Sequence, residues 1–212
     1  MNDTQDHDTD RFGGRLSLIR PSDLSGPQQG LYAYLELSKL PWAEAAGFQA
    51  RLADGRLIGP FNVFLHAPEM SRAFNAWIDA EAKHSTLTKP ARQTVILAVG
   101  VAWRAAYEVY AHAAVARQDG LDAECIRCIL GGQRPGRASP DIQAAWAFSN
   151  ALARDRAVPR SLYDDAVRCL GEQGVVDMVN LVGLYLATCA LLNAFDIPAP
   201  TTPASLTLDS LS

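Results

Sequence analysis

The sequence has few cysteines and no cluster of basic residues, and each shortage excludes a class of protein. The four cysteines among its 212 residues lie in apolar, helix-like patterns, so we expect reduced thiols rather than structural disulfides. Lysine and arginine are scattered along a chain of net charge −4, which offers a phosphate backbone no positive surface. We therefore expect no nucleic acid partner.

Signals for secretion and for membrane insertion are also missing. Residues 1–10 are acidic and polar, whereas a secretory leader needs a basic start followed by an apolar run. The most apolar stretch, residues 175–195, is interrupted by Asp177, Asn180 and Asn193, which favours a buried core helix over a membrane span. These features predict a cytoplasmic protein without a membrane partner.

Alternating polar and apolar runs bounded by hairpin turns are absent as well, so the sequence predicts an all-α fold. Apolar residues instead recur three and four positions apart, which is typical of helices with one buried face. About seven or eight helices are expected, at residues 25–37, 41–51, 68–82, 89–118, 122–130, 141–154, 159–171 and 174–194. Residues 61–66 form the least regular segment.

The composition predicts a single domain over residues 15–200. Hydrophobic residues make up 49% of the chain, which is enough for one core at this length. Residues 1–14 are acidic and poor in apolar side chains, and residues 201–212 are rich in threonine and serine. Neither end can bury enough apolar surface to offset the entropy of ordering, so we expect two flexible tails.

One polar pair stands out in the predicted helix 89–118. Glu108 and His112 are four residues apart, so they lie one turn apart on the same helix face, with their Cβ atoms roughly 5–6 Å from each other. A carboxylate that orients an imidazole and raises its proton affinity is a minimal general acid/base device. The neighbouring residues are mostly apolar, which indicates a shielded face.

Four stretches, in this order, resemble the carboxymuconolactone decarboxylase family, whose relatives include the AhpD-type alkylhydroperoxidases. They are residues 59–69, 87–99, 107–122 and 175–198. The resemblance implies an AhpD-like helical domain that forms trimers or hexamers, with its site near the subunit contacts. It also implies that Glu108 and His112 are the catalytic residues.

The peroxidase branch of the family differs from this chain at three positions. AhpD-type peroxidases carry two cysteines, seven and four residues before the histidine, and a relay glutamate nineteen before it. Here those positions hold Ala105, Glu108 and Gln93. The resemblance therefore favours the decarboxylase-like branch, which lacks the peroxidase thiols.

A different pair of cysteines keeps a redox alternative open. Cys125 and Cys128 form a Cys-x-x-Cys motif thirteen residues after His112, and a thiolate near a helix N-terminus is favoured. The same spacing also suits two small residues on a packed helix face. An alkylhydroperoxidase activity that uses these thiols is therefore an alternative.

The function expected from the resemblance is cofactor-free acid/base chemistry of the lyase or isomerase type on a small carboxylated, lactone-like molecule. A His112 imidazolium held by Glu108 would deliver the proton. No metal is expected, because two ligands are too few for a catalytic zinc. A catalytically idle, ligand-binding oligomer is a second alternative. The residues expected to hold the substrate and its carboxylate are Phe61, Asn62, Tyr107, Tyr110, Arg92 and Arg104, with Arg72 as a further candidate.

Overall fold

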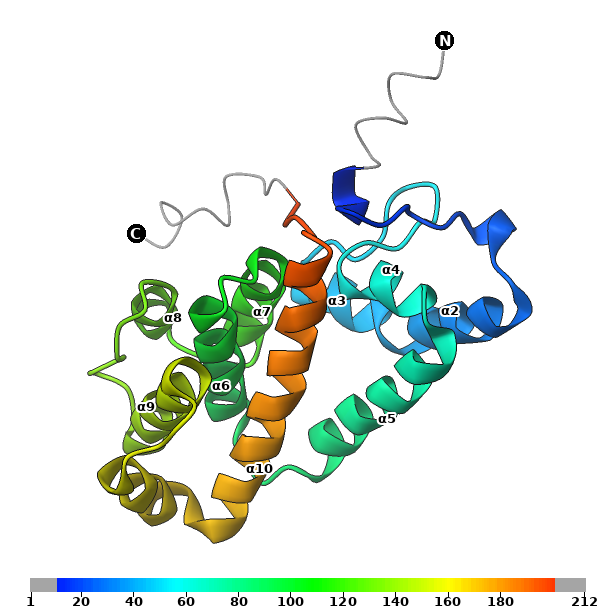
Figure 1. Cartoon of the computed structure of the whole chain (residues 1–212). Coiled ribbons are helices and arrows are strands. Elements are labelled where there is room, and N and C mark those ends of the chain that lie inside the picture. The colour runs from blue at the N-terminus through cyan, green and yellow to red at the C-terminus, as the bar shows by residue number, and fades with distance from the viewer. Residues whose placement is uncertain (1–10, 201–212) are drawn as a thin grey trace.

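The computed structural model describes residues 11–200, and every regular element in that range is helical (Figure 1). The predicted all-α fold is thus confirmed. In place of strands, the described range has one isolated antiparallel bridge, between Arg51 and Leu57. In chain order the elements are η1 (Arg11–Gly13), η2 (Pro21–Asp23), α2 (Gly26–Ser38), α3 (Leu40–Ala46), α4 (Pro60–Leu65), α5 (Pro68–His84), α6 (Lys89–Ala102), α7 (Ala106–Gln118), α8 (Ala123–Leu130), α9 (Pro140–Asp155) and α10 (Arg160–Ala194).

Helices α6, α9 and α10 pack against one another and form the centre of the C-terminal half. Helix α7 packs on α6, and the N-terminal helices α2 to α5 lie on the other side of α10 (Figure 1). Helix α6 begins where the sequence predicts, because the Thr88 hydroxyl accepts a hydrogen bond from the Ala91 amide at 3.3 Å and caps the first turn. Almost all of α6 beyond that turn is buried.

The predicted helix 89–118 is wrong in one respect, because it is two helices. The chain turns at Arg104, which adopts a left-handed conformation with φ of 54°. Gly100 lets the two helices approach closely, since a Cβ there would lie 3.2 Å from Val109 Cγ2. In one straight helix, Gln93 and His112 would be separated by roughly 28 Å along the axis. The turn folds α7 back on α6 and brings these two side chains together.

A second difference concerns the N-terminal boundary. Residues 1–10 and 201–212, where the tails are predicted, lie outside the described residues. Residues 11–14, assigned to the tail by the sequence, are instead folded against the core. Phe12 packs on the main hydrophobic cluster, and the Arg15 amide donates to the Phe195 carbonyl at 2.7 Å. One aromatic side chain and this hydrogen bond anchor a stretch that is otherwise polar.

The segment between α3 and α5 also differs from the prediction. Helix α3 ends at Ala46 rather than at residue 51, because Gly47 caps it in a left-handed conformation, and α4 forms where the pattern is least regular. Gly59 precedes α4 with φ of +64°, and a Cβ there would lie only 2.2 Å from the ring of Tyr107. Only glycine fits this close approach, which places the Tyr107 ring against the start of α4.

Helix α10 is a core helix with a kink. Gly171 has non-helical φ and ψ, so the two helices predicted for residues 159–171 and 174–194 meet there. By length and composition α10 could cross a membrane, but half of its most apolar window is buried inside the fold. That burial agrees with the predicted core helix.

Candidate active site

Helices α3 to α7 and α10 enclose a cavity of about 680 Å³. Its apolar wall is largely aromatic, a composition typical of sites for small organic ligands. The polar groups come mainly from α5, α6, α7 and α10. The aromatic residues of the wall are Trp42, Phe48, Phe61, Phe64, Tyr107 and Tyr185, and its polar residues include Asn75, Arg92, Gln93, Glu108, His112 and Thr188.

The predicted pair lies in this cavity wall. Glu108 and His112 are 3% and 5% exposed, and Glu108 Oε1 lies 3.1 Å from His112 Nε2. This distance suits an ion pair, yet Oε1 has no partner with hydrogen-bond geometry. Tyr185 of α10 places its hydroxyl 3.3 Å from the same His112 nitrogen. Two ionisable groups, Glu108 and Tyr185, therefore converge on one nitrogen of the His112 ring.

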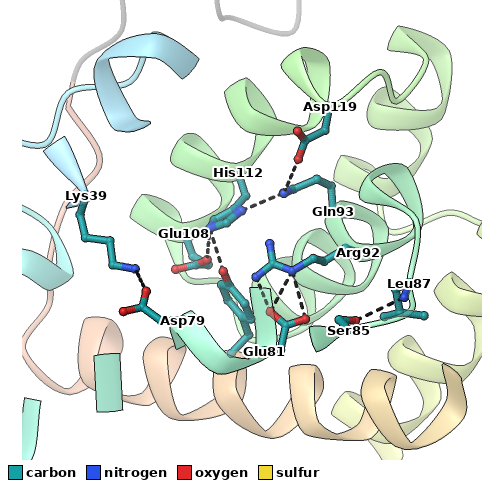
Figure 2. Close-up of polar contacts among 11 residues, drawn as sticks. Lys39, Asp79, Glu81, Ser85, Leu87, Arg92, Gln93, Glu108, His112 and Asp119 are labelled. Atoms are coloured by element: carbon teal, nitrogen blue, oxygen red, sulfur yellow. Dashed lines mark hydrogen bonds and ion pairs between the residues drawn. The ribbon is translucent and has the colours of Figure 1, made fainter. Parts of the chain in front are cut away.

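The other nitrogen of the imidazole fixes its tautomer. His112 Nδ1 lies 2.9 Å from Gln93 Oε1, and Gln93 Nε2 donates to Asp119 Oδ2 at 2.9 Å (Figure 2). The Asp119 carboxylate can only accept, so the Gln93 amide must turn its oxygen toward the ring. Nδ1 therefore carries a proton, and Nε2 of the neutral ring is the acceptor that faces Glu108 and Tyr185.

Burial sets the protonation of the pair. It raises the pKa of Glu108 to about 8, and burial together with the Arg92 charge lowers the pKa of His112 to about 3. Both shifts favour the uncharged forms, because a buried charge loses its hydration. Near neutral pH the pair therefore holds one transferable proton, on Glu108, beside a neutral imidazole. The imidazolium expected from the sequence is the less stable arrangement.

Tyr185 is the site residue that sequence reasoning missed. It is far along the chain, 73 residues after His112, and its neighbours in α10 carry no polar motif. Burial raises the pKa of Tyr185 well above its ordinary value, so the hydroxyl stays protonated and can donate to Nε2. Only the packing of α10 against α7 reveals this contact.

The cations around the cavity have carboxylate partners. Arg92 is held by Glu81, with Nε donating to both carboxylate oxygens at 2.8 and 3.1 Å (Figure 2). Lys39 Nζ lies 2.5 Å from Asp79 Oδ1. Arg92 lines the cavity and has further N–H donors, so it can still meet a ligand carboxylate.

The predicted substrate-binding residues divide into two groups. Phe61, Tyr107 and Arg92 line the cavity. The Tyr107 hydroxyl, however, already donates a hydrogen bond to the Gln49 carbonyl at 2.6 Å. The other residues of the prediction do not line it. The side chain of Asn62 is hydrogen-bonded to Ser17 and Ile19. The Tyr110 hydroxyl accepts a hydrogen bond from the Gln49 amide, and Arg72 donates to the Pro27 carbonyl. Arg104 is exposed in the turn between α6 and α7.

The Cys-x-x-Cys motif lies away from the cavity. Cys125 belongs to a second, smaller hydrophobic cluster under α8, and neither it nor Cys128 lines the cavity. Burial and the nearby Asp122 raise the pKa of Cys125, whereas a reactive thiol needs a lowered pKa. Within the described residues no group of three or more histidine, cysteine, aspartate or glutamate side chains could hold a metal ion.

Replacing Gln93 by glutamate is expected to raise the pKa of His112. A carboxylate at Nδ1 stabilises the imidazolium where the amide does not, and such a partner shifts a pKa by about 1–3 units. An NMR titration of the His112 ring protons measures the shift. Gln93→Leu is the matched control, because it removes the hydrogen bond without adding charge. An equal titration in all three proteins would contradict the assigned contact.

Comparisons with known proteins agree with this description. The family model of the carboxymuconolactone decarboxylase family matches residues 68–151. No curated protein matches the sequence.

Three solved structures share the fold. They are an uncharacterised peroxidase-related protein with an AhpD core from Ralstonia eutropha JMP134 (16% identity, 88% of this chain and 92% of that chain covered, TM-score 0.68), the debrominase Bmp8 in complex with 2,3,4-tribromopyrrole (15%, 92% and 96%, TM-score 0.70), and an uncharacterised peroxidase-related protein from Silicibacter sp. TM1040 (17%, 89% and 93%, TM-score 0.66). At these identities the likeness concerns the fold alone. The match over residues 68–151, together with the AhpD-like fold of the solved structures, supports the predicted resemblance to the carboxymuconolactone decarboxylase family.

Proposed function

We propose that this protein is a cofactor-free enzyme of the lyase or isomerase type that moves a proton on a small carboxylated, lactone-like molecule. The observation that carries the proposal is the buried pair of Glu108 and His112, 3.1 Å apart in the wall of an aromatic cavity. The pair offers an uncharged acid beside an uncharged base, which is what proton transfer to and from carbon requires near neutral pH.

The chemistry follows from the positions of the groups. In a decarboxylation, the bond between the ring carbon and the carboxyl carbon breaks, CO₂ leaves, and the electron pair remains as an enolate. Glu108 then gives its proton to carbon and becomes a carboxylate, which solvent reprotonates after the product leaves. In an isomerisation, His112 Nε2 takes a proton from one carbon while Glu108 gives one to another, and the imidazolium then returns its proton to the Glu108 carboxylate, 3.1 Å away.

Arg92 and Tyr185 support the same reaction. Arg92 remains charged and lines the cavity, so its guanidinium can bind the substrate carboxylate. The Tyr185 hydroxyl, 3.3 Å from His112 Nε2, can turn to donate to an enolate oxygen, where a fixed donor lowers the energy of developing charge. A debrominase of the same fold holds 2,3,4-tribromopyrrole, which supports a small ring compound as the ligand.

Proton exchange in D₂O tests the proposal directly. Unsaturated lactone carboxylic acids are incubated with the protein, and NMR follows deuterium entering carbon positions and CO₂ leaving. We expect activity in the wild type and in the Cys125→Ser/Cys128→Ser double variant, and a loss of about a hundredfold or more in His112→Ala.

Two outcomes would count against the proposal. Turnover that depends on the cysteines would favour the peroxidase-type alternative. Exchange that persists in the folded His112→Ala protein would show that this pair is not the catalyst, and binding of these acids without any exchange in the wild type would favour a ligand-binding protein.

The expected trimer or hexamer stays a prediction, and exposed apolar residues supply a surface for it. Met70 and Trp77 on α5 are 76% and 39% exposed, and Val176 and Val179 on α10 are 55% and 44% exposed. Helices α5 and α10 adjoin here, since a Cβ on Gly183 would lie 3.7 Å from the Trp77 ring. Burial of this surface by a second copy would remove an aggregation hazard.

A further inference from the structure

A buried amide in the cavity wall has an oxygen without a partner. Asn75 of α5 is 2% exposed and lines the cavity. Its Nδ2 donates to the Ser71 carbonyl at 2.8 Å, while its Oδ1 has no hydrogen-bond partner. The side chain thus uses its donor within its own helix and leaves its acceptor unused.

The orientation of this amide is fixed by its neighbour. A carbonyl oxygen can only accept, so turning the Asn75 amide over would set its oxygen against the Ser71 oxygen. The exchange would replace a hydrogen bond by a repulsion between two acceptors. The Asn75 oxygen is therefore turned away from the Ser71 carbonyl and remains an unpaired acceptor.

Such an acceptor is costly in an interior, and the same protein shows the usual alternative. Asn62 is fully buried, but its oxygen accepts from the Ile19 amide and its nitrogen donates to the Ser17 carbonyl, both at 3.2 Å. Buried polar atoms are nearly always paired in this way, because an unpaired one loses its hydration without compensation. The difference between the two asparagines is that Asn75 lines the cavity, where a ligand can complete the pairing.

Two cations of the cavity wall, Arg92 and Lys39, have carboxylate partners in Glu81 and Asp79. No group of the described residues donates to Asn75 Oδ1, so the occupant of the cavity can supply the missing donor.

We propose that Asn75 Oδ1 is a recognition point that accepts a hydrogen bond from a hydroxyl or ring N–H group of the bound molecule. The inference rests on the proposed function, in which the reacting part of the substrate meets Glu108 and His112 on α7. Asn75 belongs to α5, so a ligand that touches both helices has its donor group at a different point from its reacting carbon. The substrate class is therefore a small hydroxylated or N–H-bearing ring.

A matched pair of probes tests the recognition point without turnover. β-Naphthol and its methyl ether have nearly the same shape, but only the naphthol can donate. Ligand-observed NMR measures their affinities for the wild type, Asn75→Leu and Ser149→Ala. We expect the wild type to prefer the naphthol about tenfold, as one buried hydrogen bond allows.

Asn75→Leu should reduce that preference to near unity through a loss of naphthol binding, with ether binding retained. Ser149→Ala is the matched control, because Ser149 Oγ is likewise buried and unpartnered but does not line the cavity; it should keep the wild-type preference. The melting temperature of Asn75→Leu should not fall, since leucine removes an unpaired acceptor from the interior.

Three results would overturn the inference: equal affinity of the wild type for both probes, no binding of either, or an equal loss of both in Asn75→Leu. A different result would reject the proposed function but not the recognition point. In that case the naphthol preference would depend on Asn75 while His112→Ala left proton exchange unchanged.

Discussion

Replacing Glu108 by glutamine is expected to lower turnover by about a hundredfold to ten-thousandfold, the range that general acid catalysis contributes, while the protein stays folded. Glutamine has the shape of a protonated glutamate and fits the same buried position. It cannot release a proton, however, so the substitution removes the acid of the pair and leaves no void in the packing. Steady-state kinetics on a substrate identified by proton exchange measures the effect.

The same substitution should change how stability depends on pH. The pKa of Glu108 is raised from 4.5 to about 8 in the folded protein, so the folded state binds a proton that the unfolded state releases. The stability this contributes is fully present below pH 4.5 and is lost as the pH rises toward 8. The Glu108→Gln variant does not lose this stability as the pH rises. Near pH 8 it should therefore be more stable than the wild type by about 1–3 kcal/mol.

His112 contributes with the opposite sign. Its pKa is lowered from 6.5 to about 3, so its contribution is present above pH 6.5 and is lost as the pH falls toward 3. Urea unfolding of the wild type and of Glu108→Gln at a series of pH values separates the two groups. Parallel stability curves for the two proteins above pH 5 would show that Glu108 is ionised in the fold, and would remove the acid from the proposed mechanism.

The sequence predicts the two central residues because their relation is local. Glu108 and His112 are one helical turn apart, and that spacing survives any packing of the helix. Gln93 is different, since its contact with His112 depends on the turn at Arg104, where the pattern of apolar residues runs on without interruption. The left-handed residue there is an arginine, a residue type that gives no turn signal.

The sequence could not predict the contact of Tyr185 or the protonation of the pair, for a different physical reason. Tyr185 meets His112 only through the packing of α10 on α7, and one sequence carries no record of such a contact. The direction of proton transfer depends on burial, which spacing does not measure. A glutamate beside a histidine suggests an imidazolium, but burial raises the pKa of Glu108 and lowers that of His112, which favours the proton on Glu108.

The salt bridge of Arg92 and Glu81 provides the other large expected effect. The side chains of Arg92 and Glu81 are 17% and 3% exposed, so removing one partner leaves a largely buried charge. We expect Arg92→Met alone to lower the free energy of unfolding by about 3–5 kcal/mol, because the Glu81 carboxylate is then unpaired in the interior. Chemical denaturation at neutral pH measures the loss.

The double variant Arg92→Met/Glu81→Leu separates the cost of the stranded charge from the value of the pair. Two apolar side chains of similar size should recover most of the lost stability, since replacing a buried ion pair is often neutral. The positive charge that lowers the pKa of His112 is then gone, so the His112 ring should titrate closer to its usual range. If the double variant is stable and His112 still titrates as in the wild type, Arg92 has no electrostatic role at the imidazole, and burial alone keeps the ring neutral.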